Sequence, residues 1–278
     1  MKIHDDLAKE VTVTDLGDGR GVLYPVRLPT FHRVPAPVEL TQLVRWFWIP
    51  RWNLAPGRTS RQQLLPFPAS NLVVQTDGVT LSGPTSGASH RDLQGSGWAV
   101  GALLRPAGVT SLSDDPRSIR DDEVPYDAPG LHRDVVAAMS DDDEEAGRAA
   151  AVAAFVAWAG EHLATPGESA LLANAMEDVI ASDRGIVRVE QVADHLGTSV
   201  RGVQRLAARH VGLPPLAIIR RYRLQEAAQR LREDSTLTVA RVAADLGYAD
   251  QAHLAADFRR VLGLAPSDYR RDPDHAPG

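Results

Sequence analysis

The sequence predicts an α+β chain of several domains: a β-rich N-terminal region, a helical connector and an all-α C-terminal region of two helix-turn-helix units. Three observations support this class. Short apolar runs broken by proline and glycine fill the first 130 residues, alanine-rich stretches follow them, and one apolar pattern occurs twice near the C-terminus. The 278 residues suffice for more than one core, and we expect boundaries at 1–130, 131–182 and 183–278.

The first 130 residues have the pattern of short strands. Four apolar runs alternate with turn signals such as Asp77-Gly78 and Gly83-Pro84. The runs cover residues 21–28, 43–49, 71–75 and 98–104. Short strands with frequent proline and glycine punctuation are typical of a small β-barrel or sandwich.

An aromatic cluster at residues 46–52 is the densest feature of this region. In a strand, Trp46 and Trp48 share one face and Phe47 takes the other. One interpretation is the wall of an effector pocket, in which an arginine pairs with an anionic group. The other is barrel core, where tryptophan supplies buried area. The pocket interpretation involves Trp46, Trp48, Arg51, Trp98 and Arg105.

The connector is expected to be helical. An acidic run at 141–145 precedes an alanine-rich stretch at 146–163, and acidic residues at a helix start complement its dipole. Pro166-Gly167 interrupts the chain before a second helix at 169–182. An apolar stripe including Phe155 suits packing against the barrel or against a partner subunit, and the sequence leaves both open.

The repeated pattern follows the connector. Residues 189–197 carry apolar side chains at helical spacing and end in Gly197, and residues 239–247 repeat them, ending in Gly247. A second amphipathic helix follows each copy, at 199–211 and 250–262. Such a unit presents its second helix to the DNA major groove, although a helical bundle with a solvated basic face has a similar pattern.

The polar faces of these second helices indicate DNA contacts. Arginine can bond guanine bidentately and glutamine can bond adenine, while Ser199 and Asp250 stand where an N-cap is expected. We expect base contacts from Arg201, Gln204, Arg205, Gln251 and His253. We expect phosphate contacts from Ser199, Arg209, Arg220, Arg221, Asp250, Arg259 and Arg260.

The two units differ at the reading positions. The second unit has one extra residue after its turn. When the units are aligned, alanines 252, 255 and 256 stand at the positions of Arg201, Gln204 and Arg205. Alanine can touch a thymine methyl group but makes no bidentate base contact. We therefore expect the first unit to discriminate bases and the second mainly to anchor the domain.

Residues 184–271 resemble the DNA-binding domain of the AraC/XylS family of bacterial transcription regulators. The likeness rests on residues 246–254, LGYADQAHL, and on Phe258-Arg259-Arg260, Gly263, Pro266 and Tyr269-Arg270. Ala207 departs from the large apolar residue usual in the family. The resemblance implies base reading by the first helix and a cupin-like N-terminal sensor, and residues 101–108 resemble a strand-and-turn motif of such sensors.

Composition narrows the remaining choices. The chain has no cysteine, which excludes disulfides, thiolate metal sites and the alkyl-accepting repair proteins that share this module. The net charge is −6, yet residues 183–278 hold 15 arginines against 12 acidic residues, so the basic excess lies in the segment expected to meet phosphate. The histidines are scattered, and we expect no metal and no cofactor. With no signal peptide or membrane span evident, we expect a cytoplasmic protein.

These features together predict an effector-responsive transcription regulator that binds double-stranded promoter DNA and is not an enzyme. Its further expected partners are a small-molecule effector, RNA polymerase and a second copy of the chain. Two alternatives stay open. One is a cupin-like enzyme fused to a DNA-binding domain, and the other is a DNA-binding regulator that needs no ligand.

Overall fold

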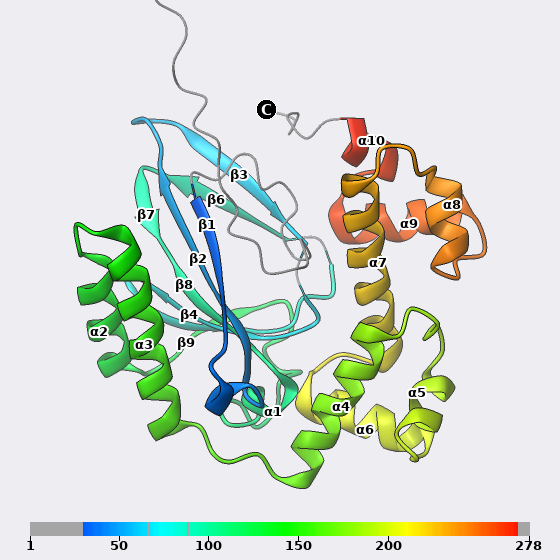
Figure 1. Cartoon of the computed structure of the whole chain (residues 1–278), viewed down its shortest axis with the longest axis horizontal. Coiled ribbons are helices and arrows are strands. Elements are labelled where there is room, and N and C mark those ends of the chain that lie inside the picture. Colours follow the sequence, from blue (N-terminus) through cyan, green and yellow to red (C-terminus); the bar gives the residue numbers. More distant parts are fainter. Residues whose placement is uncertain (1–29, 66, 88, 272–278) are drawn as a thin grey trace, which may run out of the picture.

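The computed structural model describes residues 30–65, 67–87 and 89–271 (Figure 1). Within them the N-terminal region forms a seven-stranded antiparallel sheet and a separate two-stranded sheet. The large sheet runs in the order β1-β2-β8-β4-β5-β9, with β7 also paired to β2, and β3 pairs with β6. The strands are β1 (Thr30–Pro35), β2 (Val44–Asn53), β3 (Thr59–Leu64), β4 (Asn71–Gln75), β5 (Gly78–Ser82), β6 (Ser89–Gln94), β7 (Ser96–Trp98), β8 (Val100–Leu104) and β9 (Glu123–Pro125).

Three of the four predicted strand segments are confirmed as β2, β4 and β8. The fourth, at 21–28, lies outside the described residues. The alternation predicted for β2 is also confirmed, because Phe47 packs into one core and Trp46 and Trp48 pack against another. The large sheet therefore buries both of its faces.

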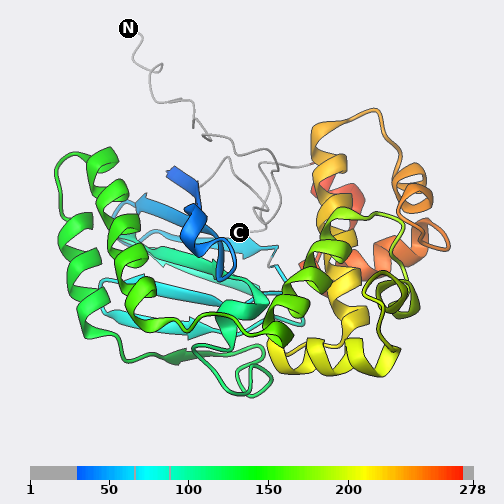
Figure 2. The same cartoon turned by 60° about the horizontal axis from the view of Figure 1, so that its bottom comes forward.

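Two helices cover the first face of the sheet, α2 (Pro129–Met139) and α3 (Glu144–His162) (Figure 2). Phe47 of β2 meets Phe155 of α3 with ring centroids 5.6 Å apart. The carboxylate of Asp143 accepts hydrogen bonds from the backbone N–H groups of Glu145 and Ala146, so α3 begins before residue 146. Phe155 packs on the sheet, which decides between the two roles left open for its stripe.

The second face of the sheet packs against the helices of the C-terminal half. These are α4 (Glu168–Ser182), α5 (Val189–His195), α6 (Val200–His210), α7 (Pro215–Glu233), α8 (Val239–Asp245), α9 (Gln251–Leu262) and α10 (Pro266–Arg271). One core joins Leu103 of the sheet to Met176 of α4, Val203 of α6 and Ile218 of α7. Short helices η2 (Val38–Leu40) and α1 (Pro106–Val109) complete the described elements.

The long helix α7 connects the two helix-turn-helix units. Its first half contributes Ile218 and Ile219 to the core of the first unit. Its second half contributes Leu224 and Leu231 to the core of α8 and α9, which also contains Leu65 from the sheet region. Both units thus touch the sheet region. No helix in the described part of the chain has the length and apolar character that a membrane crossing requires.

Candidate nucleic-acid interface

Both helix-turn-helix units turn on a glycine in the left-handed region. Gly197 has φ of +58° and Gly247 has φ of +67°. The following N–H groups close the same hydrogen bond in each unit, from Thr198 to Ala193 O at 3.0 Å and from Tyr248 to Ala243 O at 2.9 Å. Because glycine adopts this backbone without steric cost, the repeated pattern specifies the same turn twice.

Side-chain caps start the second helix of each unit, as predicted. The Ser199 hydroxyl accepts a hydrogen bond from the Gly202 N–H at 3.1 Å. The Asp250 carboxylate accepts one from the His253 N–H at 2.8 Å. These bonds satisfy N–H groups that a helix start leaves unpaired. Both side chains are therefore engaged as caps. A carboxylate repels phosphate, so we do not retain Asp250 as a phosphate contact, whereas the Ser199 hydroxyl keeps its hydrogen free to donate.

Helix α6 presents a polar face to solvent. Val203 and Ala207 are buried against α5 and α7, while Arg201, Gln204 and Arg205 are exposed. Among the described residues, none of the arginines on α6 forms an ion pair. Three adjacent side chains with free donors on one exposed helix face can meet base edges in a major groove.

Helix α9 presents a different face. Gln251, Ala252 and Ala256 are exposed, so the alanines predicted at the reading positions do reach the surface. The ring of His253 packs edge-on against Tyr248, with centroids 5.2 Å apart. Gln251 is thus the reading residue of α9 that is exposed and carries no such packing.

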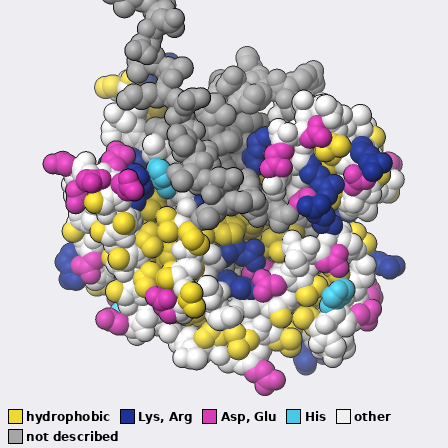
Figure 3. Space-filling view, viewed as in Figure 1, with side chains coloured by type: hydrophobic (Ala, Val, Ile, Leu, Met, Phe, Trp, Pro, Cys, Tyr) yellow, Lys and Arg dark blue, Asp and Glu magenta, His cyan; other side chains and the backbone are white. Residues whose placement is uncertain are grey.

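The basic residues expected at phosphate fall into two groups. Arg209 and Arg259 are exposed, and Arg260 is exposed while pairing with Asp257 at 2.8 Å. Arg220 is half-buried. Arginine side chains gather over the second unit, at the right of the space-filling view (Figure 3).

Arg221 does not fit the expected phosphate contact. Its residue is 4% exposed, and its Nη2 donates to the carbonyl oxygen of Thr85 in the sheet region at 2.9 Å. A side chain enclosed in this way cannot reach the backbone of a docked duplex. The sequence places Arg220 and Arg221 side by side, and only the packing of α7 on the sheet region tells them apart.

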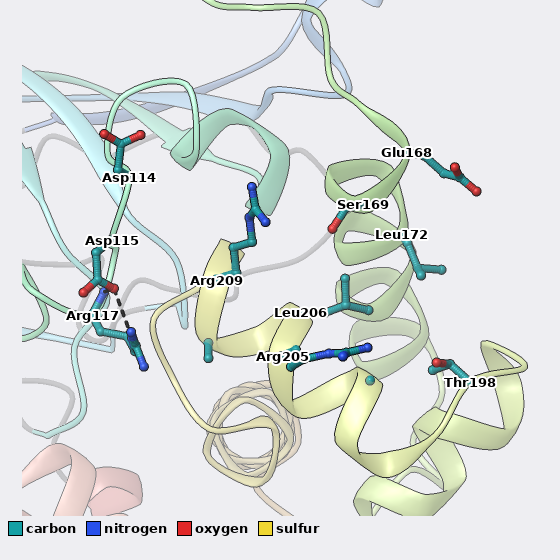
Figure 4. Close-up of a pocket in the computed structure, with 12 residues that line it drawn as sticks. Asp114, Asp115, Arg117, Glu168, Ser169, Leu172, Thr198, Arg205, Leu206 and Arg209 are labelled. Atoms are coloured by element: carbon teal, nitrogen blue, oxygen red, sulfur yellow. Dashed lines mark hydrogen bonds and ion pairs between the residues drawn. The ribbon is translucent and has the colours of Figure 1, made fainter.

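A cavity of about 910 Å³ lies beside the reading helix (Figure 4). Arg205 and Arg209 of α6 line one side, and Asp114 and Asp115 of the β8–β9 connection line another. Glu168 of α4 also lines it. The acidic side chains of the sheet region therefore lie near the helix expected to meet phosphate, and like charges near a docked backbone oppose binding.

A buried ion-pair network joins the sheet region to α4 and α7. The carboxylate of Glu177 lies 3.1 Å from Nη2 of Arg45 and accepts a hydrogen bond from the Tyr222 hydroxyl at 2.9 Å. Burial opposes the charge of Arg45, but Glu177, Tyr222 and Asp178 together outweigh it and raise the pKa of Arg45 above its usual value. Burial, then Glu177, raises the pKa of Tyr222. Sequence reasoning missed this network, whose only signal is an adjacent Glu-Asp pair in a largely apolar helix.

The five residues expected around an effector do not form one cluster, because they pack on different faces of the sheet or form different ion pairs. Trp46 and Trp48 face the helical core, where Trp46 meets Phe67 edge-on and Trp48 donates from Nε1 to Asn71 at 2.9 Å. Trp98 packs against the core on the other face of the sheet.

The two arginines expected around an effector, Arg51 and Arg105, form separate ion pairs. Arg51 pairs with Glu144 at 3.3 Å and Arg105 pairs with Asp178 at 2.6 Å. These pairs tie the sheet region to α3 and α4. Among the described residues, no group of three or more His, Asp or Glu side chains is arranged to hold a metal ion.

Two family models match the chain. A model described as a helix-turn-helix domain covers residues 192–272, and a model described as a domain of unknown function, DUF6597, covers residues 32–125. The first match contains both reading helices. The second contains the strands of both sheets except the first residues of β1.

Known proteins are similar over about a third of the chain. A "Putative AraC-like transcription regulator" of Streptomyces lividans is 37% identical over 113 residues, which are 38% of this chain and 37% of that protein. The "HTH-type transcriptional activator RhaS" of Escherichia fergusonii is 34% identical over 85 residues, 31% of this chain and 30% of that protein. The chain thus matches about a third of the length of these relatives.

Among solved structures, one is similar over more of the chain but at lower identity. The structure of ToxT from Vibrio cholerae aligns with a TM-score of 0.45 and 12% identity, covering 81% of this chain and 98% of that one.

Proposed function

We propose that the chain is a sequence-specific transcription regulator of the AraC family, which binds promoter DNA through the helix-turn-helix domain that the family model matches at residues 192–272. The observation that carries the proposal is the exposed face of α6, where Arg201, Gln204 and Arg205 stand together without ion-pair partners among the described residues. The relatives are named as regulators, which favours regulation over catalysis.

We propose specific roles for the exposed residues. Arg201, Gln204 and Arg205 contact base edges, with Gln251 and His253 contributing from α9. Ser199, Arg209, Arg220, Arg259 and Arg260 contact phosphates, which position the domain without reading sequence. The RNA polymerase and homodimer partners stay proposals that rest on the regulator role alone, and a cytoplasmic location follows from a DNA target.

The proposed domain division differs from the sequence expectation in one respect. The expected boundary at 183 cuts between α4 and α5, but Ala173 and Met176 of α4 share a core with Val192 and Val203 of the first unit. We propose that α4 belongs to the DNA-binding part and that the division falls in the 163–167 connection. A fragment that starts at 183 would expose the apolar face on which α4 packs.

The test of the base contacts is a pair of substitutions. Arg205→Ala should weaken binding to a selected DNA site by about 1–3 kcal/mol, and weaken binding to random DNA much less. Arg259→Ala is the matched control from α9, and it should weaken both DNAs alike because phosphate contacts carry no sequence information. Gel-shift titrations on both DNAs measure the losses. Equal losses on the two DNAs for Arg205→Ala would reduce this residue to a phosphate contact.

The sheet region is proposed to sense an effector. Its support is the contact that both units make with it, through Leu103 and Leu65, since a ligand that shifts the sheet region can then act on both. A regulator that needs no ligand stays the second candidate, favoured by the dense packing around Trp46 and Trp48. Gel-shift titrations of the full chain with and without a small-molecule extract of the cell that produces it compare the two candidates. Equal DNA affinity in both would support the regulator that needs no ligand.

A further inference from the structure

A small cavity lies where the sheet region meets the second helix-turn-helix unit. Its volume is about 220 Å³. Thr85 and Ser86 of the β5–β6 connection form one wall, and α7 and α9 form the others. Arg220 and Arg221 of α7 and Arg260 of α9 contribute charge. None of the five residues expected around an effector lines this cavity, so the cavity is a separate site.

The buried guanidinium of Arg221 is compensated by opposite charge only in part. Its Nη2 donates to Thr85 O, but its Nη1 is buried and has no hydrogen-bond partner among the described residues. Among the described residues, no carboxylate forms an ion pair with it. Burial, then the nearby charge of Arg260, lowers the pKa of Arg221 to about 10, and Asp121 opposes this only in part. A buried charge without an ion-pair partner is strongly unfavourable, and an anion bound beside Arg221 would offset this cost.

Other polar groups around the cavity fit the same ligand. The Thr85 hydroxyl is buried and has no hydrogen-bond partner in the described part of the chain, so it can donate to an anion. The Ser86 hydroxyl already donates to Asp121. Asp257 is the acidic residue of the lining; one carboxylate oxygen accepts from Arg260 and the other is buried and unpaired. Three arginines against one aspartate leave the lining net positive.

We propose that this cavity binds a small organic anion, a carboxylate or phosphate with a compact apolar body. The planar guanidinium of Arg221 matches the two oxygens of such a head group. Apolar side chains including Leu213, Leu224 and Val261 line the rest of the cavity and suit the body. The volume is below the usual range for drug-sized ligands, so the body is small.

The position of the site gives the anion a role. A bound anion would contact Thr85 of the sheet region on one side and α7 and α9 of the DNA-binding part on the other. It would therefore hold α9 against the sheet region. That effect on DNA binding rests on the proposed function, whereas anion binding itself rests only on the cavity.

The test uses the full chain without DNA. Thermal unfolding and titration calorimetry are run with inorganic phosphate, acetate and benzoate, against sodium chloride at equal ionic strength. At least one of the three anions should raise the melting temperature saturably, and benzoate should bind more tightly than acetate if the apolar wall contributes. The phosphate and carboxylate arms tell which head group is held. Absence of a saturable rise above chloride for all three would overturn the proposal.

Substitutions locate the binding. Arg221→Met should weaken it about 10-fold to 100-fold, the range for losing hydrogen bonds to a charged group. Without anion, Arg221→Met should unfold at the same or a higher temperature, because an unpaired buried charge is removed; a merely structural arginine would show a loss. Arg133→Met removes a surface arginine of α2 and should leave anion binding intact. Equal stabilisation of the wild type and Arg221→Met by the anion would contradict the site.

A second variant keeps the test sharp if Arg221→Met fails to fold. Thr85→Val removes the unpaired hydroxyl, retains the side-chain shape and should weaken anion binding several-fold. Because these assays contain no DNA, their failure leaves the proposed regulator role untouched. A loss of DNA binding in Arg205→Ala with normal anion binding would separate the two sites in the same way.

Discussion

Gly212 and Gly263 occupy equivalent positions after the two reading helices and offer a controlled test of the docking between the sheet region and α6. Both have positive φ, +83° at Gly212 and +74° at Gly263. An added Cβ at Gly263 would meet nothing within 4 Å. One at Gly212 would lie 2.6 Å from the carbonyl oxygen of Pro116, in the β8–β9 connection. The two alanine variants therefore share the backbone strain and differ in the contact.

The expected costs follow from these distances. Gly263→Ala should cost about 1 kcal/mol, the left-handed backbone strain of about 1–2 kcal/mol less the gain from a stiffer unfolded chain. Gly212→Ala carries the same strain plus an overlap with backbone, which adds about 1–3 kcal/mol as overpacking does. The total for Gly212→Ala is about 2–4 kcal/mol.

Urea unfolding followed by tryptophan fluorescence measures both variants, since Trp46 and Trp48 lie at the boundary between sheet and helices. Hydrogen exchange in the connection around Pro116 should rise in Gly212→Ala and not in Gly263→Ala. Equal losses of stability, with unchanged exchange at Pro116, would show that the sheet region does not rest against the end of α6.

Three further outcomes are expected. Glu177→Met should destabilise the chain by about 3–5 kcal/mol in urea, because Arg45 loses its buried partner, and adding Arg45→Met should recover most of the loss. Gln225→Met should stabilise it by about 1–3 kcal/mol, because neither end of this fully buried amide has a hydrogen-bond partner among the residues that the structure describes; an unchanged unfolding midpoint would show that a partner is present. Burial, then Arg209, lowers the pKa of His210 below 6.5, so its contribution to the free energy of unfolding is complete above pH 6.5 and is lost as pH falls through the lowered value. His210→Leu should flatten the fall in stability over that acid range, and a profile that keeps its slope would assign the fall to another group.

Much of the helical half could be predicted from sequence because its signals are local. A glycine after an apolar stripe sets each turn, and a serine or aspartate three residues before a paired N–H sets each cap. The burial of Val203 and the exposure of Arg205 follow from helical spacing alone. The same reasoning correctly separated Trp46 from Phe47 in β2.

The remaining features depend on contacts between distant segments. Strands β3 and β6 are largely polar and pair mainly with each other, so they lack the apolar alternation by which β2 was found. Glu177 meets Arg45 across more than a hundred residues, and Arg221 meets Thr85 across a similar span. No spacing rule connects such pairs. Only the docking of the sheet region on α4 and α7 distinguishes the buried Arg221 from its neighbour Arg220.

The central claim is that α6 reads bases while α9 mainly anchors the domain. Selection of binding sites from a random DNA library by the full chain tests it most directly. Alanines 252 and 256 of α9 are exposed at the positions where α6 carries Arg201 and Arg205. We therefore predict one half-site with strong base preference and one nearly degenerate half-site about a helical turn away. Two half-sites of equal information content would contradict the claim.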